Sequence, residues 1–311
     1  MTDVTGSVGG PPEPPALPVG HQRKSGRKRR RWWHLGLGLA PLIGGPKCHL
    51  AWIHIRRGAV AQGYRVEELR RFRSYLATHW NYKKPVYQYP LQRPRYYFPG
   101  LLAKPVHDAA AFPWTARLEE AYPIIREEML AARDRVVRKH QQNLVDQGRW
   151  NVLYFYSSGR RVDEGHELCP RTSAILESIP GIGKAGQVYF SMHSAGTHVT
   201  PHCGTTNTRL RCHLGLVVPE GCRIRVGSEI CRWQEGKCLV FDDSFEHEVW
   251  HDGDRDRVVL ILDVWHTDLS PAETWAVYEL SKLQLLNNRR YWRGAGGKAR
   301  SLFSSWARRG G

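Results

Sequence analysis

Residues 208–219 read TRLRCHLGLVVP. Side chains alternate between the two faces of a strand, so Arg209, Arg211 and His213 fall on one face, and Leu210 and Cys212 fall on the other. Similar short runs of aliphatic and aromatic residues, separated by Gly-containing turns, recur from residue 150 to residue 265. This pattern predicts a mainly β domain built as a sandwich or barrel. The cationic face of 208–219 then borders either solvent or a polar cavity.

The sequence on either side of these strands predicts two helices, and the chain as a whole divides into four expected regions. We expect one helix from Pro123 to about residue 141, packed against the sheet, and another over residues 272–286. The four expected regions are a disordered basic leader (1–50), a helical N-terminal appendage (51–92), the β domain (93–287) and a basic flexible C-terminal tail (288–311).

The net charge of +17 over 311 residues is concentrated near the N-terminus, where residues 1–92 hold 16 Lys and Arg against 4 Asp and Glu. Residues 22–33 read QRKSGRKRRRWW, a short pattern that is weakly indicative of contact with nucleic acid or an anionic membrane. A solvated tail explains it equally well.

The apolar stretch WWHLGLGLAPLIGG, residues 32–45, is too short to cross a membrane, so we expect no transmembrane span. We expect cytoplasmic residence, with a twin-arginine-type export signal as the alternative. The seven cysteines form no CxxC pair, which favours a reducing compartment and makes zinc-ribbon chemistry improbable.

Two further segments place a histidine at the expected end of a strand. They are GTHVTPHCG at residues 196–204 and FDDSFEHEVW at residues 241–250. Imidazoles on different strands of a barrel can converge on one ion of iron, copper, nickel or zinc. Any single one of the 15 histidines is more often a surface or core residue than a ligand, so the pair matters more than either member.

Three stretches resemble the catalytic core of aspartyl/asparaginyl β-hydroxylases: TNTRLRCHLGLVVPEGC (206–222), FDDSFEHEVW (241–250) and RVVLILDVWH (257–266). A weaker likeness reaches upstream to RPRYYFPGLLAKP (93–105), so the resemblance covers about residues 93–285. It implies a double-stranded β-helix, a cupin-like jelly roll of two antiparallel sheets with flanking helices. It also implies a dioxygenase that uses Fe(II), 2-oxoglutarate and O2 to hydroxylate an unactivated C–H bond, releasing succinate and CO2.

The resemblance assigns His202 and His247 as the iron ligands. Most oxygenases of the wider group add a carboxylate two positions after the first histidine, where this chain has Gly204. The missing carboxylate is itself a mark of this family, in which water fills the place. Asp243 resembles the carboxylate that hydrogen-bonds and orients this water, although a role in a turn explains it equally well.

The resemblance also assigns the cosubstrate contacts. Arg257 would pair with the distal carboxylate of 2-oxoglutarate, helped by Ser191, because a guanidinium grips a carboxylate with two hydrogen bonds. Arg211 and His213 would contact the end that chelates iron. Trp150 matches an aromatic residue of the same pocket.

The family's usual substrate implies hydroxylation at the β-carbon of Asp or Asn in a peptide or protein. A free amino acid or a lipid-linked acyl chain is the alternative within the same chemistry. An alternative of a different class is a non-catalytic β-barrel that binds zinc, nickel or no metal, tethered to nucleic acid or membrane by its basic N-terminus. That alternative assigns no shared function to Arg211, His213, Ser191 and Arg257.

Overall fold

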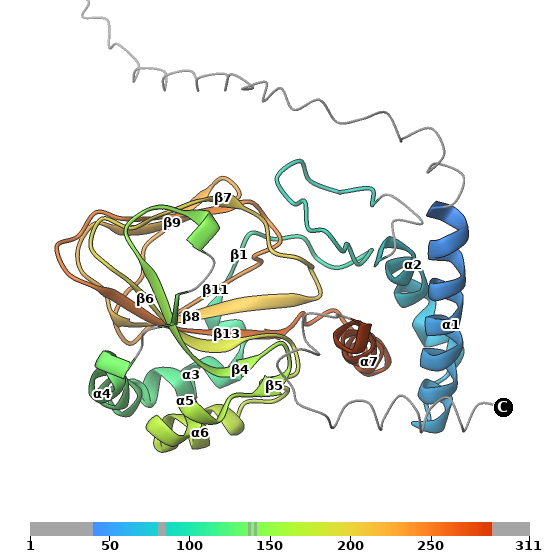
Figure 1. Ribbon diagram of the computed structural model, residues 1–311, viewed down its shortest axis with the longest axis horizontal. Coiled ribbons are helices and arrows are strands. Elements are labelled where there is room, and N and C mark those ends of the chain that lie inside the picture. Colours follow the sequence, from blue (N-terminus) through green and yellow to red (C-terminus); the bar gives the residue numbers. More distant parts are fainter. Residues whose placement is uncertain (1–39, 80–84, 136–137, 140–141, 288–311) are drawn as a thin grey trace, which may run out of the picture. The chain divides into compact units, whose positions relative to one another are not determined.

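The computed structural model describes residues 40–79, 85–135, 138–139 and 142–287 (Figure 1). The basic segment 22–33, the first 39 residues and the tail 288–311 lie outside the described residues. No helix of the described residues is long and apolar enough to span a membrane.

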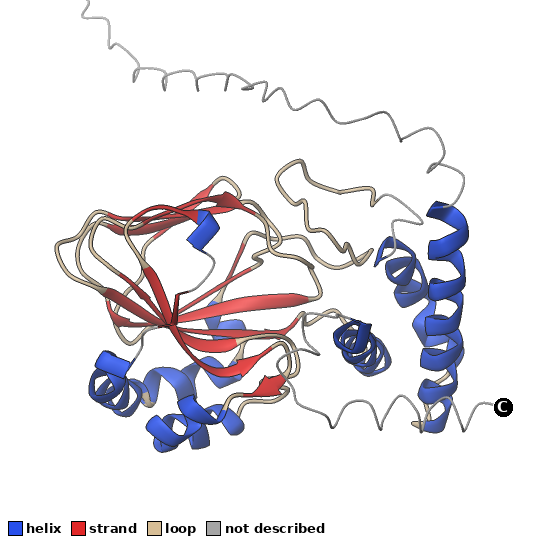
Figure 2. Ribbon diagram, in the orientation of Figure 1, coloured by secondary structure: helices blue, strands red, loops and turns tan. Residues whose placement is uncertain are grey.

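Two sheets face each other, and all their strand pairings are antiparallel (Figure 2). In order, the eight-stranded sheet contains β1 (Val106–His107), β11 (Cys238–Phe241), β8 (Arg209–Val217), β13 (Arg257–Trp265), β6 (Val188–His193), β4 (Trp150–Ser157) and β2 (Arg138–Lys139), with β5 (Arg160–Arg161) paired to β4. The five-stranded sheet contains β10 (Glu229–Cys231), β9 (Cys222–Val226), β12 (His247–His251), β7 (His198–His202) and β3 (Val145–Gln147).

The chain alternates between these sheets. From β6 to β13 it passes to β7 in the small sheet, back to β8, across to β9 and β10, back to β11, across to β12 and back to β13. This winding gives the order β6-β13-β8-β11 in one sheet and β7-β12-β9-β10 in the other. The predicted double-stranded β-helix is confirmed by this order.

The two faces of the large sheet have different environments. Leu210, Cys212 and Leu214 of β8 lie in an apolar core covered by helices, and none of them is exposed. The covering helices are α3 (Pro113–Glu120), α4 (Tyr122–Ala132), α5 (Asp163–Leu168) and α6 (Pro170–Glu177) (Figure 1). The opposite face of the sheet borders the barrel interior, where Tyr189 and Ile261 pack with apolar residues of the small sheet. The row Arg209, Arg211 and His213 therefore faces inward.

Helix α4 ends at Ala132, nine residues before the predicted end at residue 141. A short 3₁₀ turn, η3 (Arg133–Arg135), follows it, and Arg133 makes an ion pair of 2.9 Å with Asp256. The other short 3₁₀ segments are η1 (Val66–Leu69), η2 (Ala109–Ala111) and η4 (Gln142–Leu144). The predicted C-terminal helix is present as α7 (Pro271–Asn287).

The first two α-helices of the described residues share a core with α7. Helices α1 (Ala40–Ala61) and α2 (Arg70–His79) pack with α7 and with Phe98 and Leu101. The buried carboxylate of Glu273 in α7 accepts a hydrogen bond of 2.9 Å from Arg71 in α2. The leader predicted to end at residue 50 overlaps a helix that begins at Ala40, and the described residues from Pro41 onward belong to one compact unit. Burial against α7 joins residues on both sides of the boundary predicted at residue 92 into one apolar core.

Candidate metal centre

Two histidines lie directly opposite each other at one end of the barrel. His202 ends β7 and His247 begins β12, and the two residues are partners in the antiparallel register. Opposite residues of neighbouring strands project to the same face of a sheet. The ring centroids are 4.1 Å apart, so both imidazoles can reach one small ion.

Backbone hydrogen bonds fix the orientation of both rings. His202 Nδ1 lies 2.8 Å from the carbonyl oxygen of Thr200, and His247 Nδ1 lies 2.9 Å from that of Phe245. A carbonyl only accepts, so each Nδ1 carries the hydrogen and each Nε2 keeps its lone pair for a metal. Burial lowers the pKa of His202 and, together with the neighbouring His202 ring, holds the pKa of His247 well below its usual range. Both rings are therefore neutral, as metal binding requires.

Asp243 occupies the space that a side chain at position 204 would need. A Cβ placed on Gly204 would lie 2.4 Å from Asp243 Oδ1, and the Gly204 N–H donates to the Asp243 carbonyl over 2.6 Å. The usual third carboxylate has no room there. Within the described residues, no group of three or more His, Cys, Asp or Glu side chains is arranged to hold a metal. The protein therefore offers two imidazoles, with a carboxylate behind them.

Gly204→Ala is expected to lower the free energy of unfolding by about 1–3 kcal/mol, because the new methyl group displaces Asp243, and to weaken metal binding. Thermal denaturation and titration with Co(II) measure the two effects. Gly63→Ala is the control, because Gly63 has φ of +85° and open space around it. That control should lose about 1–2 kcal/mol through backbone strain and keep its affinity for Co(II). Equal Co(II) affinity in the Gly204 variant would contradict the proposed importance of this contact.

Arg211 lies in the site, but its positive charge already pairs with two carboxylates of the protein. Its Nη1 is 3.1 Å from Asp243 Oδ2, and its Nε is 2.9 Å from Asp263 Oδ1. From β8, Arg211 thus holds Asp243 in place. Its contact with the chelating end of the cosubstrate stays a prediction.

Arg257 lies at the deep end of the barrel and is 1% exposed. Its guanidinium stacks 4.4 Å from the centroid of Trp233, and its Nη2 donates to His193 Nδ1 over a long 3.4 Å. Among the described residues, its Nε and Nη1 have no hydrogen-bond partner, and no carboxylate pairs with it. Burial lowers the pKa of Arg257 to about 10, so it stays cationic at neutral pH. A buried, unpaired cation costs several kcal/mol, which an anionic ligand would offset.

The predicted neighbours of Arg257 are gathered beside it on adjacent strands. Ser191 pairs in register with the residue two positions after Arg257, and Trp150 Nε1 donates to Ser191 Oγ over 3.0 Å. His213 Nδ1 accepts from Trp233 Nε1 over 3.2 Å, so the hydrogen of the neutral ring sits on Nε2, which has no partner among the described residues. The structure thus brings four of the five predicted cosubstrate residues together with donors that lack acceptors.

His213 connects the two ends of the site. Its pKa is held well below the usual range first by burial and then by the positive charges of Arg257 and Arg211, with a further contribution from the neighbouring His247 ring. Arg257 lies at the deep end, Arg211 pairs with Asp243, and His247 belongs to the histidine pair, so all three surround the ring of His213. Asp243 Oδ1 is a further buried atom without a partner in the described residues. The interior therefore presents unpaired donors at one end and an unpaired acceptor near the two imidazoles.

Two important side chains were not predicted from the sequence. Trp233 follows β10 in a stretch without strand periodicity, and it contacts both Arg257 and His213. Asp263 is fully buried in β13, where it pairs with Arg211. An acidic residue inside the apolar run RVVLILDVW was the signal that could have revealed it.

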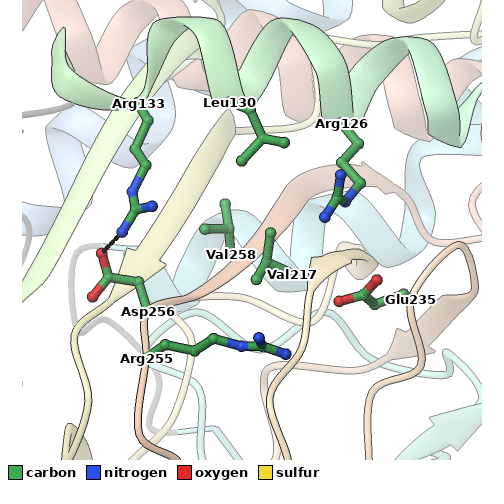
Figure 3. A pocket seen from close by; sticks show the side chains of 8 residues that line it. All are labelled: Arg126, Leu130, Arg133, Val217, Glu235, Arg255, Asp256 and Val258. Carbon is green, nitrogen blue, oxygen red and sulfur yellow. Dashed lines mark hydrogen bonds and ion pairs between the residues drawn. The ribbon is translucent and has the colours of Figure 1, made fainter.

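A separate cavity of about 310 Å³ lies between α4 and strands β8 and β13 (Figure 3). Two of its charged groups already contact protein: Arg133 pairs with Asp256, and Glu235 accepts from the Val218 N–H and the Tyr122 hydroxyl. It contains none of the predicted site residues. We assign it no role in the chemistry.

Several known proteins resemble this chain in sequence. The profile of the family described as aspartyl/asparaginyl beta-hydroxylase matches residues 119–267. Human aspartyl/asparaginyl beta-hydroxylase is 38% identical over 221 residues, which cover 68% of this chain but 28% of that protein. Ornithine lipid ester-linked acyl 2-hydroxylase of Rhizobium tropici is 38% identical over 190 residues, covering 57% of this chain and 66% of that protein. A prolyl-4-hydroxylase structure from Pseudomonas putida overlaps with a TM-score of 0.35 at 10% identity, covering 49% of this chain and 98% of that one.

Proposed function

The chain belongs to the aspartyl/asparaginyl β-hydroxylase family through residues 119–267, and on that premise we propose that it is an Fe(II)- and 2-oxoglutarate-dependent hydroxylase. The observation that carries the proposal is the buried guanidinium of Arg257, which has no carboxylate partner in the described residues and shares one interior with two metal-competent imidazoles. A non-catalytic metal-binding barrel would not explain why this buried cation lacks a carboxylate partner.

The donor set fits the proposed metal. His202 and His247 would hold Fe(II) through their Nε2 atoms, since both Nδ1 atoms are engaged by backbone carbonyls. Asp243 Oδ1 would accept a hydrogen bond from a water in the place of the missing carboxylate. When bound, Fe(II) together with 2-oxoglutarate and O2 supplies the oxidising power to insert oxygen into an unactivated C–H bond, with succinate and CO2 as coproducts.

The remaining residues bind and orient. Arg257, with Ser191 beside it, would receive the distal carboxylate of 2-oxoglutarate through its free Nε and Nη1. His213 would donate its Nε2 hydrogen to the other end, and Trp150 would hold Ser191 in place. The apolar walls of the barrel exclude water, which keeps the reaction directed at the substrate. None of these groups acts as a general acid or base.

The proposed substrate is the β-carbon of Asp or Asn in a peptide or protein, as the name of the human relative suggests. A lipid-linked acyl chain is the second candidate, because the Rhizobium tropici relative is equally similar and its name specifies that chemistry. The aligned part of the chain spans 28% of the length of the human relative, so the substrate named for that protein is only proposed for this chain.

Anaerobic titration with Fe(II) and then 2-oxoglutarate tests the proposal. A weak visible charge-transfer band is expected only when both are present, because the band requires simultaneous chelation. Succinate is the matched control, since it has the distal carboxylate and lacks the 2-oxo group. Exposure to O2 with candidate peptides, amino acids and acyl lipids, followed by mass spectrometry, should then show one added oxygen in the true substrate. A flat difference spectrum in folded protein would favour the non-catalytic barrel.

A further inference from the structure

Residues 91–98, which we call the strap, run alongside the loop between β11 and β12. The Glu246 N–H donates to the Leu91 carbonyl over 2.7 Å, and the Arg93 N–H donates to the Ser244 carbonyl over 3.2 Å. Gln92 lies between these contacts and forms an antiparallel bridge with Phe245. The strap thus pairs with the loop that carries Asp243 and leads into His247.

The same strap also contacts the loop that follows His202. The Tyr96 N–H donates to the Thr205 carbonyl over 2.9 Å, and the Phe98 N–H donates to Asn207 Oδ1 over 2.7 Å. The two loops that flank the histidine pair are therefore joined to one extended segment. That segment lies outside residues 119–267, which match the family.

Gln92 anchors the strap with a buried side chain that is 1% exposed. Its Nε2 donates to Asp242 Oδ2 and to Ser244 Oγ, each over 3.0 Å. The other oxygen of Asp242 accepts from the Ser244 N–H over 2.9 Å. Asp242 is fully buried, and no cation among the described residues pairs with it. The amide of Gln92 is therefore a principal stabilising contact of this carboxyl group, because buried polar groups need partners.

Asp243 follows Asp242 directly, so the position of one constrains the other. The carbonyl of Asp243 accepts from the Gly204 N–H, and its carboxylate fills the space beside that glycine. We propose that Gln92 is a positioning residue of the metal centre, which holds Asp242 and thereby fixes Asp243 behind the two histidines. This inference rests on the proposed function, because Asp243 matters to a metal only if one binds there.

The chemistry of Gln92 distinguishes this role from simple packing. A leucine would fill nearly the same volume without the cost of burying an amide. The amide is useful only because two oxygens of the Asp243 loop, Asp242 Oδ2 and Ser244 Oγ, accept from it. A residue behind a metal-bound group typically changes metal affinity or activity by about 10- to 100-fold when it is lost.

Gln92→Leu tests the proposal with Co(II) alone as the probe, in the full chain. The variant is expected to bind Co(II) about tenfold more weakly than the wild type and to show a changed visible Co(II) spectrum, because Asp243 is no longer held. Thr115→Val is the matched control. Thr115 is also buried and donates its hydroxyl to backbone carbonyls, but it lies in α3 on the helical side of the large sheet. Its loss should lower thermal stability without changing the Co(II) spectrum or affinity.

Exchanging the amide and the carboxyl group between the two positions provides a rescue experiment. Gln92→Glu alone places a second carboxyl group against Asp242 and should weaken Co(II) binding. The double variant Gln92→Glu/Asp242→Asn restores an amide–carboxylate hydrogen bond in the opposite direction, so it should recover much of the affinity for Co(II). Unchanged Co(II) affinity in Gln92→Leu, with stability lowered as in Thr115→Val, would overturn the positioning role. Failure of the wild type itself to bind Co(II), or to give the Fe(II)·2-oxoglutarate band, would instead refute the proposed function and this inference with it.

Discussion

Replacing Arg257 with methionine is expected to raise the concentration of 2-oxoglutarate needed for half-saturation by about 30- to 4,000-fold, since truncating one partner of a buried charge pair costs about 2–5 kcal/mol. The same change should stabilise the ligand-free protein. The buried guanidinium has no carboxylate partner in the described residues and retains only its contact with Trp233 and a long bond to His193. Methionine has a similar length and carries no charge, so it removes the cost of burying a cation.

Two measurements on each protein check this prediction: the charge-transfer band as 2-oxoglutarate is added, and thermal denaturation with and without the cosubstrate. Arg223→Met is the control, because Arg223 lies on β9 with its side chain 31% exposed and paired with Asp252. The control should leave unchanged both the affinity for 2-oxoglutarate and the increase in thermal stability that 2-oxoglutarate causes. If Arg257→Met binds 2-oxoglutarate as tightly as the wild type, the distal carboxylate binds elsewhere.

The sequence of β8 predicted its two faces, and the structure places both as the alternation requires. Leu210, Cys212 and Leu214 pack under the helices, while Arg211 and His213 face the barrel interior. Alternation could not decide between solvent and a cavity for the polar face, because either environment accepts Arg and His. The family resemblance decided it, since it placed both residues in a cosubstrate pocket.

The partners of these polar residues could not be predicted, because they come from distant parts of the chain. Arg211 pairs with Asp263, 52 residues later, and Gln92 bonds to Asp242, 150 residues later. No local pattern contains such pairs. For the same reason the sequence could not show that Arg211 pairs with two carboxylates.

The predicted boundaries differed from the structure for a similar reason. Helix α1 begins at Ala40 within a stretch that was expected to be disordered, and its buried side packs with α7, more than 200 residues later in the sequence. Helix α4 ends at Ala132, although apolar spacing continues beyond it. Tertiary packing overrides local pattern in both cases.

His247→Ala is expected to abolish turnover and to weaken Co(II) binding by more than about 100-fold, the upper end of the loss caused by removing a residue that lies behind a ligand. The protein offers only two imidazoles at this centre, because the described residues contain no third His, Cys, Asp or Glu in position to bind. Removing one leaves a single protein ligand. The fold should persist, since the β12 pairings with β7 and β9 are made by the backbone. Circular dichroism measures whether the fold persists, and Co(II) titration measures the affinity for the metal.

His251→Ala is the matched control, since this histidine lies on the same strand and the same inward face, four positions later. Its Nδ1 contacts the Cys222 thiol, and its Nε2 contacts the Arg255 carbonyl, so neither ring nitrogen is available to a metal. This variant should lose about 1–3 kcal/mol of stability through unpaired buried groups and still bind Co(II). Because both variants delete a buried imidazole from β12, only the availability of Nε2 distinguishes them. Equal loss of Co(II) binding in both would mean that strand integrity, and not ligation by His247, controls the centre.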